Sequence, residues 1–255
     1  MRTPVIAGNW KCNMRLESAW ELASGIRDRV HEIEGVEKIV CPTFVHLPTV
    51  EVALTTTSVK VGAQDLHWED DVAATGAVGP KMLEEIVDYV IVGHSERRHD
   101  FGESDEAVNR KVKAALEAGL QPIMCVGETQ VERDAGKTEE VLLRQTRSAL
   151  DGVDMPEGFI IAYEPVWAIG TGTPATAQDA DDAIGLIRRE VASLFGVEKA
   201  DSVRVLYGGS VKADNILEFM ERDGIDGALV GGASLNAESF SEIIEQTARM
   251  GLASG

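Results

Sequence analysis

Eight short runs of β-forming residues recur along the chain, and helix-patterned segments separate them. One such segment spaces its apolar residues by three or four positions, at Leu16, Ala19, Trp20, Ala23, Ile26, Val30 and Ile33. Strands that are apolar on both faces and alternate with helices favour a parallel sheet with both faces covered. Eight such units close most simply into a barrel, so the sequence predicts an α/β fold, a single (β/α)8 barrel with a closed eight-stranded parallel sheet. The predicted strands are VIAG (5–8), EKIVCP (37–42), VKVGAQ (59–64), YVIVGH (89–94), PIMCVG (122–127), FIIAYE (159–164), VRVLYG (203–208) and GALVGG (227–232).

Length and composition are consistent with this fold. The chain has 255 residues, of which 44% are hydrophobic, and about 250 residues is typical of such a barrel. The same length would also suit two modest domains, but no linker-like or low-complexity stretch divides the chain. We therefore expect one catalytic domain over residues 1–255. The segment from Asp65 to Gly79 is too long and polar for an ordinary connection, which predicts a role of its own.

The charge and cysteine content exclude several classes of protein. A net charge of -19 argues against nucleic acid as a partner, because phosphate backbones would be repelled. Cys12, Cys41 and Cys125 are widely spaced and predict neither a disulfide framework nor a zinc site. No apolar stretch approaches the ~18 to 20 residues of a membrane span, and the start lacks the apolar core of an export signal. We expect a cytoplasmic location.

Polar residues follow several of the predicted strands directly. The carboxyl ends of parallel barrel strands share one face, so side chains far apart in the sequence can meet there. The residues at these ends are Asn9, Lys11, His94, Glu96 and Glu164, followed by GGS (208–210) and GGAS (231–234). The sequence therefore predicts one site at this end of the barrel.

Glycine-bearing turns follow the last three predicted strands, at 170–172, 208–210 and 231–232. Each alone is more often a plain tight turn. Glycine also lets backbone N–H groups approach an anion, and a helix N-terminus adds a favourable dipole. Together the three turns indicate a phosphate site built from neutral donors.

Glu164, His94 and Lys11 have residue types suited to acid–base chemistry. Taken singly, each is more often a solvated or structural side chain. Glu164 follows the apolar run FIIAY, and partial desolvation there would raise its affinity for a proton and suit it to act as a general base. Glu96 lies close to His94 and could also pair with Lys11 if the strand ends converge.

Five motifs occur in one order along the chain: NWKCN (9–13), GHSERR (93–98), CVGE (125–128), YEPVWAIGTG (163–172) and YGGS (207–210). In this order they resemble the triosephosphate isomerases nearly end to end. The resemblance implies a homodimeric enzyme of glycolysis and gluconeogenesis that interconverts dihydroxyacetone phosphate and D-glyceraldehyde 3-phosphate through an enediolate, with no cofactor or metal. It assigns catalysis to Lys11, His94 and Glu164, and substrate binding to Asn9, Lys11, Gly170, Ser210, Gly231 and Gly232. Beside that site it places Ser95, Glu96 and Tyr207.

The stretch after Glu164 joins stiff residues to loose ones. The resemblance implies a lid that excludes water during catalysis, formed by Pro165, Val166, Trp167, Ala168, Ile169, Gly170, Thr171, Gly172 and Thr173. It also implies that Thr75 reaches across a dimer interface towards the partner's site.

Two positions depart from the family pattern. Thr173 stands where many relatives have lysine, which predicts a different stiffness at the second hinge of the lid. Ala77 replaces a glutamate that resembles an intersubunit partner for Arg97, so the dimer contact is expected to be altered.

The sequence leaves two other functions to consider. One is a different phosphate-binding barrel, such as a sugar-phosphate isomerase of amino-acid biosynthesis or a Schiff-base aldolase. The aldolase would carry a lysine on a central strand, where this chain has Glu164. A catalytically inactive barrel would lack at least one of Lys11, His94 and Glu164, and all three are present.

Overall fold

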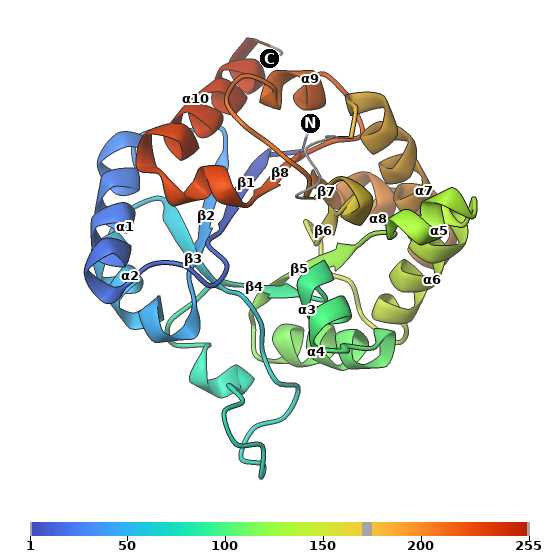
Figure 1. The fold of residues 1–255 in the computed structure, drawn as a ribbon, viewed down its shortest axis with the longest axis horizontal. Coiled ribbons are helices and arrows are strands. Elements are labelled where there is room, and N and C mark those ends of the chain that lie inside the picture. Colours follow the sequence, from blue (N-terminus) through green and yellow to red (C-terminus); the bar gives the residue numbers. More distant parts are fainter. Residues whose placement is uncertain (1, 170–174, 254–255) are drawn as a thin grey trace.

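Eight parallel strands form a closed barrel in chain order in the computed structural model, which describes residues 2–169 and 175–253. β1 pairs with β8 and closes the sheet. Figure 1 shows the strands around a centre that the helices surround. The predicted barrel is confirmed, and each predicted strand matches an observed one to within two residues at either end. The strands are β1 (Val5–Asn9), β2 (Glu37–Cys41), β3 (Val59–Ala63), β4 (Tyr89–Val92), β5 (Gln121–Val126), β6 (Ile160–Tyr163), β7 (Arg204–Tyr207) and β8 (Gly227–Val230).

The helices lie outside the barrel and cover its outer surface (Figure 1). Several begin at a side-chain cap, such as Ser104 before α4 and Thr176 before α7, as expected for residues that satisfy free N–H groups. The α-helices of the described residues are α1 (Leu16–Val30), α2 (Leu47–Leu54), α3 (Ser95–Asp100), α4 (Asp105–Glu117), α5 (Gln130–Asp134), α6 (Thr138–Leu150), α7 (Ala177–Phe195), α8 (Val197–Ser202), α9 (Ile216–Met220) and α10 (Ala237–Ala253).

The hydrophobic core has two layers because successive strand residues point to opposite faces. Residues from alternate positions form a cluster inside the barrel, including Val5, Ile39, Ile91 and Ile123. A larger cluster packs between the strands and the helices. The inner layer is tight at Gly62, where a Cβ atom would lie 2.7 Å from the Sγ atom of Cys41. The interior is therefore filled, and it supports a site at its end rather than a channel.

Helix α1 exists as predicted, but part of its predicted buried face is wrong. Ala19, Ala23, Ile26 and Val30 are buried, as expected. Leu16 and Trp20 are exposed, and their place on the buried face is taken by other residues, chiefly Leu22. Several faces of this helix carry apolar residues, so spacing alone could not fix which face meets the barrel.

The segment between β3 and a short 3-10 helix at Pro80–Met82 projects from the barrel. It is drawn in teal at the bottom of Figure 1 and contains the residues from Asp65 to Gly79. Across this range there is no helix or strand, as the sequence predicted. Thr75 is exposed on it.

No helix in the part of the chain that the structure describes is long and apolar enough to cross a membrane.

Candidate active site

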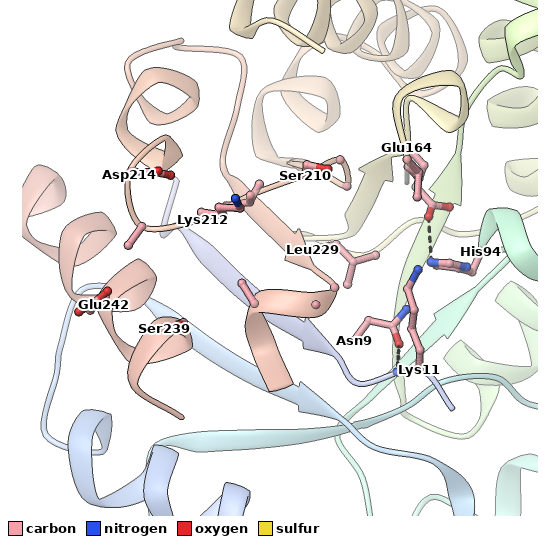
Figure 2. Close-up of a pocket in the computed structure, with 18 residues that line it drawn as sticks. Asn9, Lys11, His94, Glu164, Ser210, Lys212, Asp214, Leu229, Ser239 and Glu242 are labelled. Atoms are coloured by element: carbon pink, nitrogen blue, oxygen red, sulfur yellow. Dashed lines mark hydrogen bonds and ion pairs between the residues drawn. The ribbon is translucent and has the colours of Figure 1, made fainter. Parts of the chain in front are cut away.

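A cavity of about 750 Å³ opens at the carboxyl end of the strands. Asn9, Lys11, His94 and Glu164 line one side of it, and Ser210 lies across from them (Figure 2). Gly231 and Gly232 also line this cavity. The structure thus brings together the described side chains that the sequence predicted to converge, from β1, β4, β6, β7 and β8. Gly170, the remaining predicted substrate-binding residue, lies outside the described residues.

The backbone of Glu164 is fixed by the strands on either side of it. Its N–H donates to the carbonyl of Val126 at the end of β5 (2.8 Å), and the preceding carbonyl of Tyr163 accepts from Gly208 N–H after β7 (2.7 Å). A Cβ atom on Gly127 would lie 1.8 Å from the carbonyl oxygen of Glu164. A glycine there lets the backbones meet, so the barrel itself positions the carboxylate.

The carboxylate of Glu164 is almost completely buried and has three close donors. Ser95 donates from its backbone N–H (2.8 Å) and from its hydroxyl (3.1 Å). The Nε2 atom of His94 lies 2.9 Å from the same carboxylate (Figure 2). Because Ser95 is the first residue of α3, the N-terminus of that helix faces the negative charge.

The expected proton affinity of Glu164 is corrected by these contacts. Burial alone would raise the pKa of Glu164, as the sequence predicted, but His94 and the donors of Ser95 together hold this pKa below its ordinary value. The carboxylate is therefore ionised in this arrangement. The sequence could predict the burial, but it could not reveal the donors that outweigh it.

His94 is held so that only its Nε2 atom can donate. The Nδ1 atom accepts a hydrogen bond from the backbone N–H of Glu96 (3.2 Å), which leaves Nε2–H to face Glu164. Burial lowers the pKa of His94, but the adjacent Glu164 carboxylate outweighs it, so the pKa lies above its usual value. The increase in the pKa of His94 is caused by the Glu164 carboxylate, so it is lost if that carboxylate moves away. The hydrogen bond from Glu96 N–H to Nδ1 does not involve Glu164 and remains.

Lys11 and Asn9 enter the cavity from the end of β1. The Nζ atom of Lys11 lies 2.5 Å from Glu96 Oε1, which confirms the predicted pairing. Lys11 has a positive φ of 51°, an uncommon conformation for a residue other than glycine. Two hydrogen bonds hold it there, from its own N–H to Asn9 Oδ1 (2.9 Å) and from Gln64 Nε2 to its carbonyl (2.9 Å). The backbone is strained where it presents the ammonium to the cavity.

The glycine turns after β7 and β8 form the other side of the cavity. Gly208, Gly209 and Ser210 follow β7, and Gly231 and Gly232 follow β8. A Cβ atom on Gly209 would lie 2.2 Å from the Tyr207 hydroxyl, so this turn requires glycine. Such turns can present backbone N–H groups to an anion, which suits a strongly acidic protein. Lys212 lines the same side of the cavity (Figure 2).

The three residues predicted beside the site lie as follows. Ser95 bonds Glu164, and Glu96 pairs with Lys11. Tyr207 is buried and stacks on Phe219, with ring centroids 4.1 Å apart. Its hydroxyl has no hydrogen-bond partner among the described residues.

The predicted lid is described only in part. Val166, Trp167 and Ala168 form a 3-10 turn after Pro165, and Ile169 lines the cavity. The remaining predicted lid residues, Gly170, Thr171, Gly172 and Thr173, lie outside the described residues.

Sequence reasoning did not assign a role to a buried polar cluster behind the 3-10 turn. Its centre is Glu128, which is fully buried and accepts hydrogen bonds from the Tyr163 hydroxyl and from Trp167 Nε1 (2.9 Å). Burial raises the pKa of Glu128, against the opposing effect of its donors. Arg133 completes the cluster. The position of Glu128 directly after the predicted apolar strand 122–127 was the one sequence signal that could have indicated this cluster.

Among the described residues, no group of three or more His, Cys, Asp and Glu side chains could hold a metal ion. Cys41 and Cys125 are buried, and burial raises the pKa of both thiols. Neither thiol is therefore activated as a nucleophile.

The fold and this cavity define an α/β-barrel enzyme in which a buried carboxylate, an imidazole and an ammonium face glycine turns. Comparison with known proteins identifies the family within this class of enzymes. The sequence model described as triosephosphate isomerase matches residues 4–247. The chain belongs to the triosephosphate isomerase family.

Curated relatives named triosephosphate isomerase match nearly the whole chain. One from Thermoanaerobacter sp. is 52% identical over 247 residues, covering 96% of this chain and 99% of the relative. One from Dehalococcoides mccartyi is 50% identical over 248 residues, covering 97% of this chain and 98% of the relative. One from Alkaliphilus oremlandii is 49% identical over 247 residues, covering 96% and 99%.

Proposed function

We propose that this chain interconverts dihydroxyacetone phosphate and D-glyceraldehyde 3-phosphate, a step of glycolysis and gluconeogenesis. The observation that carries the proposal is the cavity in which Glu164, His94 and Lys11 face one another across from the turns after β7 and β8. Family membership supports the same activity. The whole chain would act as one catalytic domain.

Glu164 is the proposed base. Its carboxylate takes a proton from one carbon of the substrate, and the electron pair of that C–H bond forms the enediolate. The carboxylic acid then returns the proton to the neighbouring carbon, so Glu164 ends as it began. The hydroxyl proton passes from one substrate oxygen to the other in the same sequence, so that the old hydroxyl becomes the new carbonyl and the old carbonyl the new hydroxyl. Because the carboxylate is bonded to Ser95, it must first leave those donors and turn towards the substrate.

His94 and Lys11 would stabilise the charge that develops on the substrate oxygens. A neutral His94 donates from Nε2 once Glu164 has turned away, since Nδ1 stays bonded to Glu96 N–H. The Lys11 ammonium offsets the negative charge of the enediolate. Asn9 would contact the substrate beside Lys11.

The phosphate would bind at Ser210, Gly231 and Gly232, with Gly170 joining from the lid. Backbone N–H groups of glycine turns suit this anion, because they add no fixed charge and approach it closely. Closure of the segment from Pro165 to Thr173 would exclude water from the enediolate. The apolar side chain of Ile169, which already lines the cavity, supports this role.

We infer a homodimer in the cytoplasm, with Thr75 reaching into the partner's site. Exposed apolar side chains on and around the projecting loop support this surface: Val45, Val72, Met82 and Phe101. Arg97 Nε lies 2.9 Å from Asp65 Oδ2 of its own chain, so its charge is met without an acid at Ala77. Sedimentation equilibrium would test the dimer, and a monomer at micromolar concentration would contradict it.

A coupled assay tests the activity. Dihydroxyacetone phosphate is supplied, and the aldehyde product is consumed by a dehydrogenase that reports on a nicotinamide. A two-carbon phosphorylated enediolate mimic should inhibit competitively. Absence of turnover with pure, folded protein would refute the proposed function and favour an inactive barrel.

A further inference from the structure

The guanidinium of Arg133 contacts one residue before positions 170–174 of the chain and one residue after them. Its Cζ atom lies 4.0 Å from the ring centroid of Trp167. Its Nη2 atom donates to Asp179 Oδ1 at 2.6 Å. Trp167 precedes residues 170–174 in the chain and Asp179 follows them. One side chain on α5 thus links the two ends of this segment, and Figure 1 shows α5 beside α7.

The indole of Trp167 is held on its edge and on its face. Its Nε1–H donates to buried Glu128 (2.9 Å), and Arg133 stacks on the ring while its Nη1 donates to the same carboxylate (3.3 Å). A guanidinium can stack and donate through its planar fork at the same time, which an ammonium cannot do. Glu128 and Arg133 together therefore restrict both the tilt and the position of the Trp167 ring.

The other end of the link is the first turn of α7. Asp179 accepts from the N–H (3.0 Å) and the hydroxyl (2.6 Å) of Thr176, and Thr176 caps the helix in return. Although burial alone would raise the pKa of Asp179, its bonds to Thr176 and Arg133 lower it. Asp179 is therefore a charged and fixed acceptor for Arg133.

We propose that Arg133 is a positioning residue of the isomerase, which sets the separation between Trp167 and the start of α7 and thereby the approach of Glu164 to the substrate. This inference rests on the proposed function. Glu164 lies three residues before Trp167 on the same short connection. Because strand bonds hold the backbone of Glu164, a displaced indole moves Pro165 and Val166 beside it and so alters the turn of the Glu164 side chain towards the substrate, not the position of its backbone. If the contacts of Arg133 only stabilised the fold, their removal would lower the unfolding temperature and leave the working site unchanged.

The first test needs no substrate. The protein is labelled with 5-fluorotryptophan, and its four tryptophan resonances are assigned by single Trp→Phe variants. In Arg133→Met, the fluorine resonance of Trp167 should shift and broaden while those of Trp10 and Trp20 stay in place. Arg144→Met is the matched control, because Arg144 is a half-exposed arginine on α6 that pairs with Asp105.

The second test is kinetic and is run well below the unfolding temperature of each variant. We expect Arg133→Met to lower kcat about tenfold and Asp179→Asn about threefold. The double variant should be no slower than Arg133→Met, because both changes break one link. Arg133→Lys should recover part of the loss, since it restores charge but not the stacked fork.

The outcomes of these tests distinguish failure of the proposed isomerase function from failure of the positioning role of Arg133. Wild-type protein without isomerase turnover would refute the proposed function. Suppose that the wild type is active and that Arg133→Met keeps the wild-type kcat and an unmoved Trp167 resonance. This result would refute the positioning role and leave the proposed function standing. If Arg133→Met does not fold, the same readouts in Arg133→Lys and Asp179→Asn decide, and wild-type behaviour in both would overturn the inference.

Discussion

Shortening the proposed base by one methylene is the most direct test of the site. Glu164→Asp withdraws the carboxylate by about 1.5 Å, the length of one C–C bond. The backbone cannot follow, because neighbouring strands bond it on both sides. A displacement of about 1 Å can cost about a hundredfold in rate, which corresponds to about 2.7 kcal/mol in the barrier. We expect kcat to fall by about a hundredfold or more.

The coupled assay measures this change, and circular dichroism with a thermal melt shows whether the fold is kept. Loss of one buried methylene should lower the free energy of unfolding by about 1 kcal/mol, and the weakened contacts to Ser95 and His94 should lower it by about 1 to 3 kcal/mol more. Glu21→Asp, the same change at an exposed position of α1, is the control and should behave as wild type. A folded Glu164→Asp protein with turnover within about threefold of wild type would remove Glu164 from its role.

Three further changes probe the site and its support. Lys11→Met should lower kcat/KM by about a hundredfold or more, because it removes the cation beside the substrate; unchanged kinetics at low salt would contradict this role. Gly127→Ala should lower the free energy of unfolding by about 3 kcal/mol or more, since its Cβ would lie 1.8 Å from the Glu164 carbonyl, whereas Gly185→Ala, with only a side-chain atom at 3.9 Å, is the tolerated control in the same urea titration. Because the pKa of Glu164 is lowered in the folded state, its stabilising contribution is complete above its unfolded pKa of about 4.5 and is lost as the pH falls through the lowered value. Wild type should therefore lose its stability advantage over Glu164→Gln on acidification from pH 7 to below 4, and an advantage that grows instead would refute the ionised, hydrogen-bonded carboxylate.

The sequence predicted the barrel and the convergence of the described site residues because both follow from topology. Alternating strands and helices specify a parallel sheet, and a closed parallel sheet brings its carboxyl ends together whatever the atomic details. Asn9, Lys11, His94 and Glu164 could therefore be placed at one cavity without knowledge of any distance. The glycine turns followed from the same reasoning.

Features that depend on the balance of particular contacts could not be predicted in this way. The pKa of Glu164 is lowered because Ser95 and His94 outweigh burial, and only their distances reveal this. The buried face of α1 was partly wrong because apolar spacing fitted more than one rotation of the helix. The link through Arg133 joins α5 to α7, and no local pattern in the sequence relates these two segments.

The closed ring of strands has a consequence for association between molecules. Because β1 bonds β8, the sheet of the folded chain has no free edge at which strands of another copy could add. Strand-by-strand growth into fibrils would first require two neighbouring strands of the ring to separate, and β7 and β8 share the shortest ladder, with Tyr207 opposite Ala228 alone. Mutations that weaken such a strand pair should therefore promote aggregation more than equally destabilising changes on the outer helices.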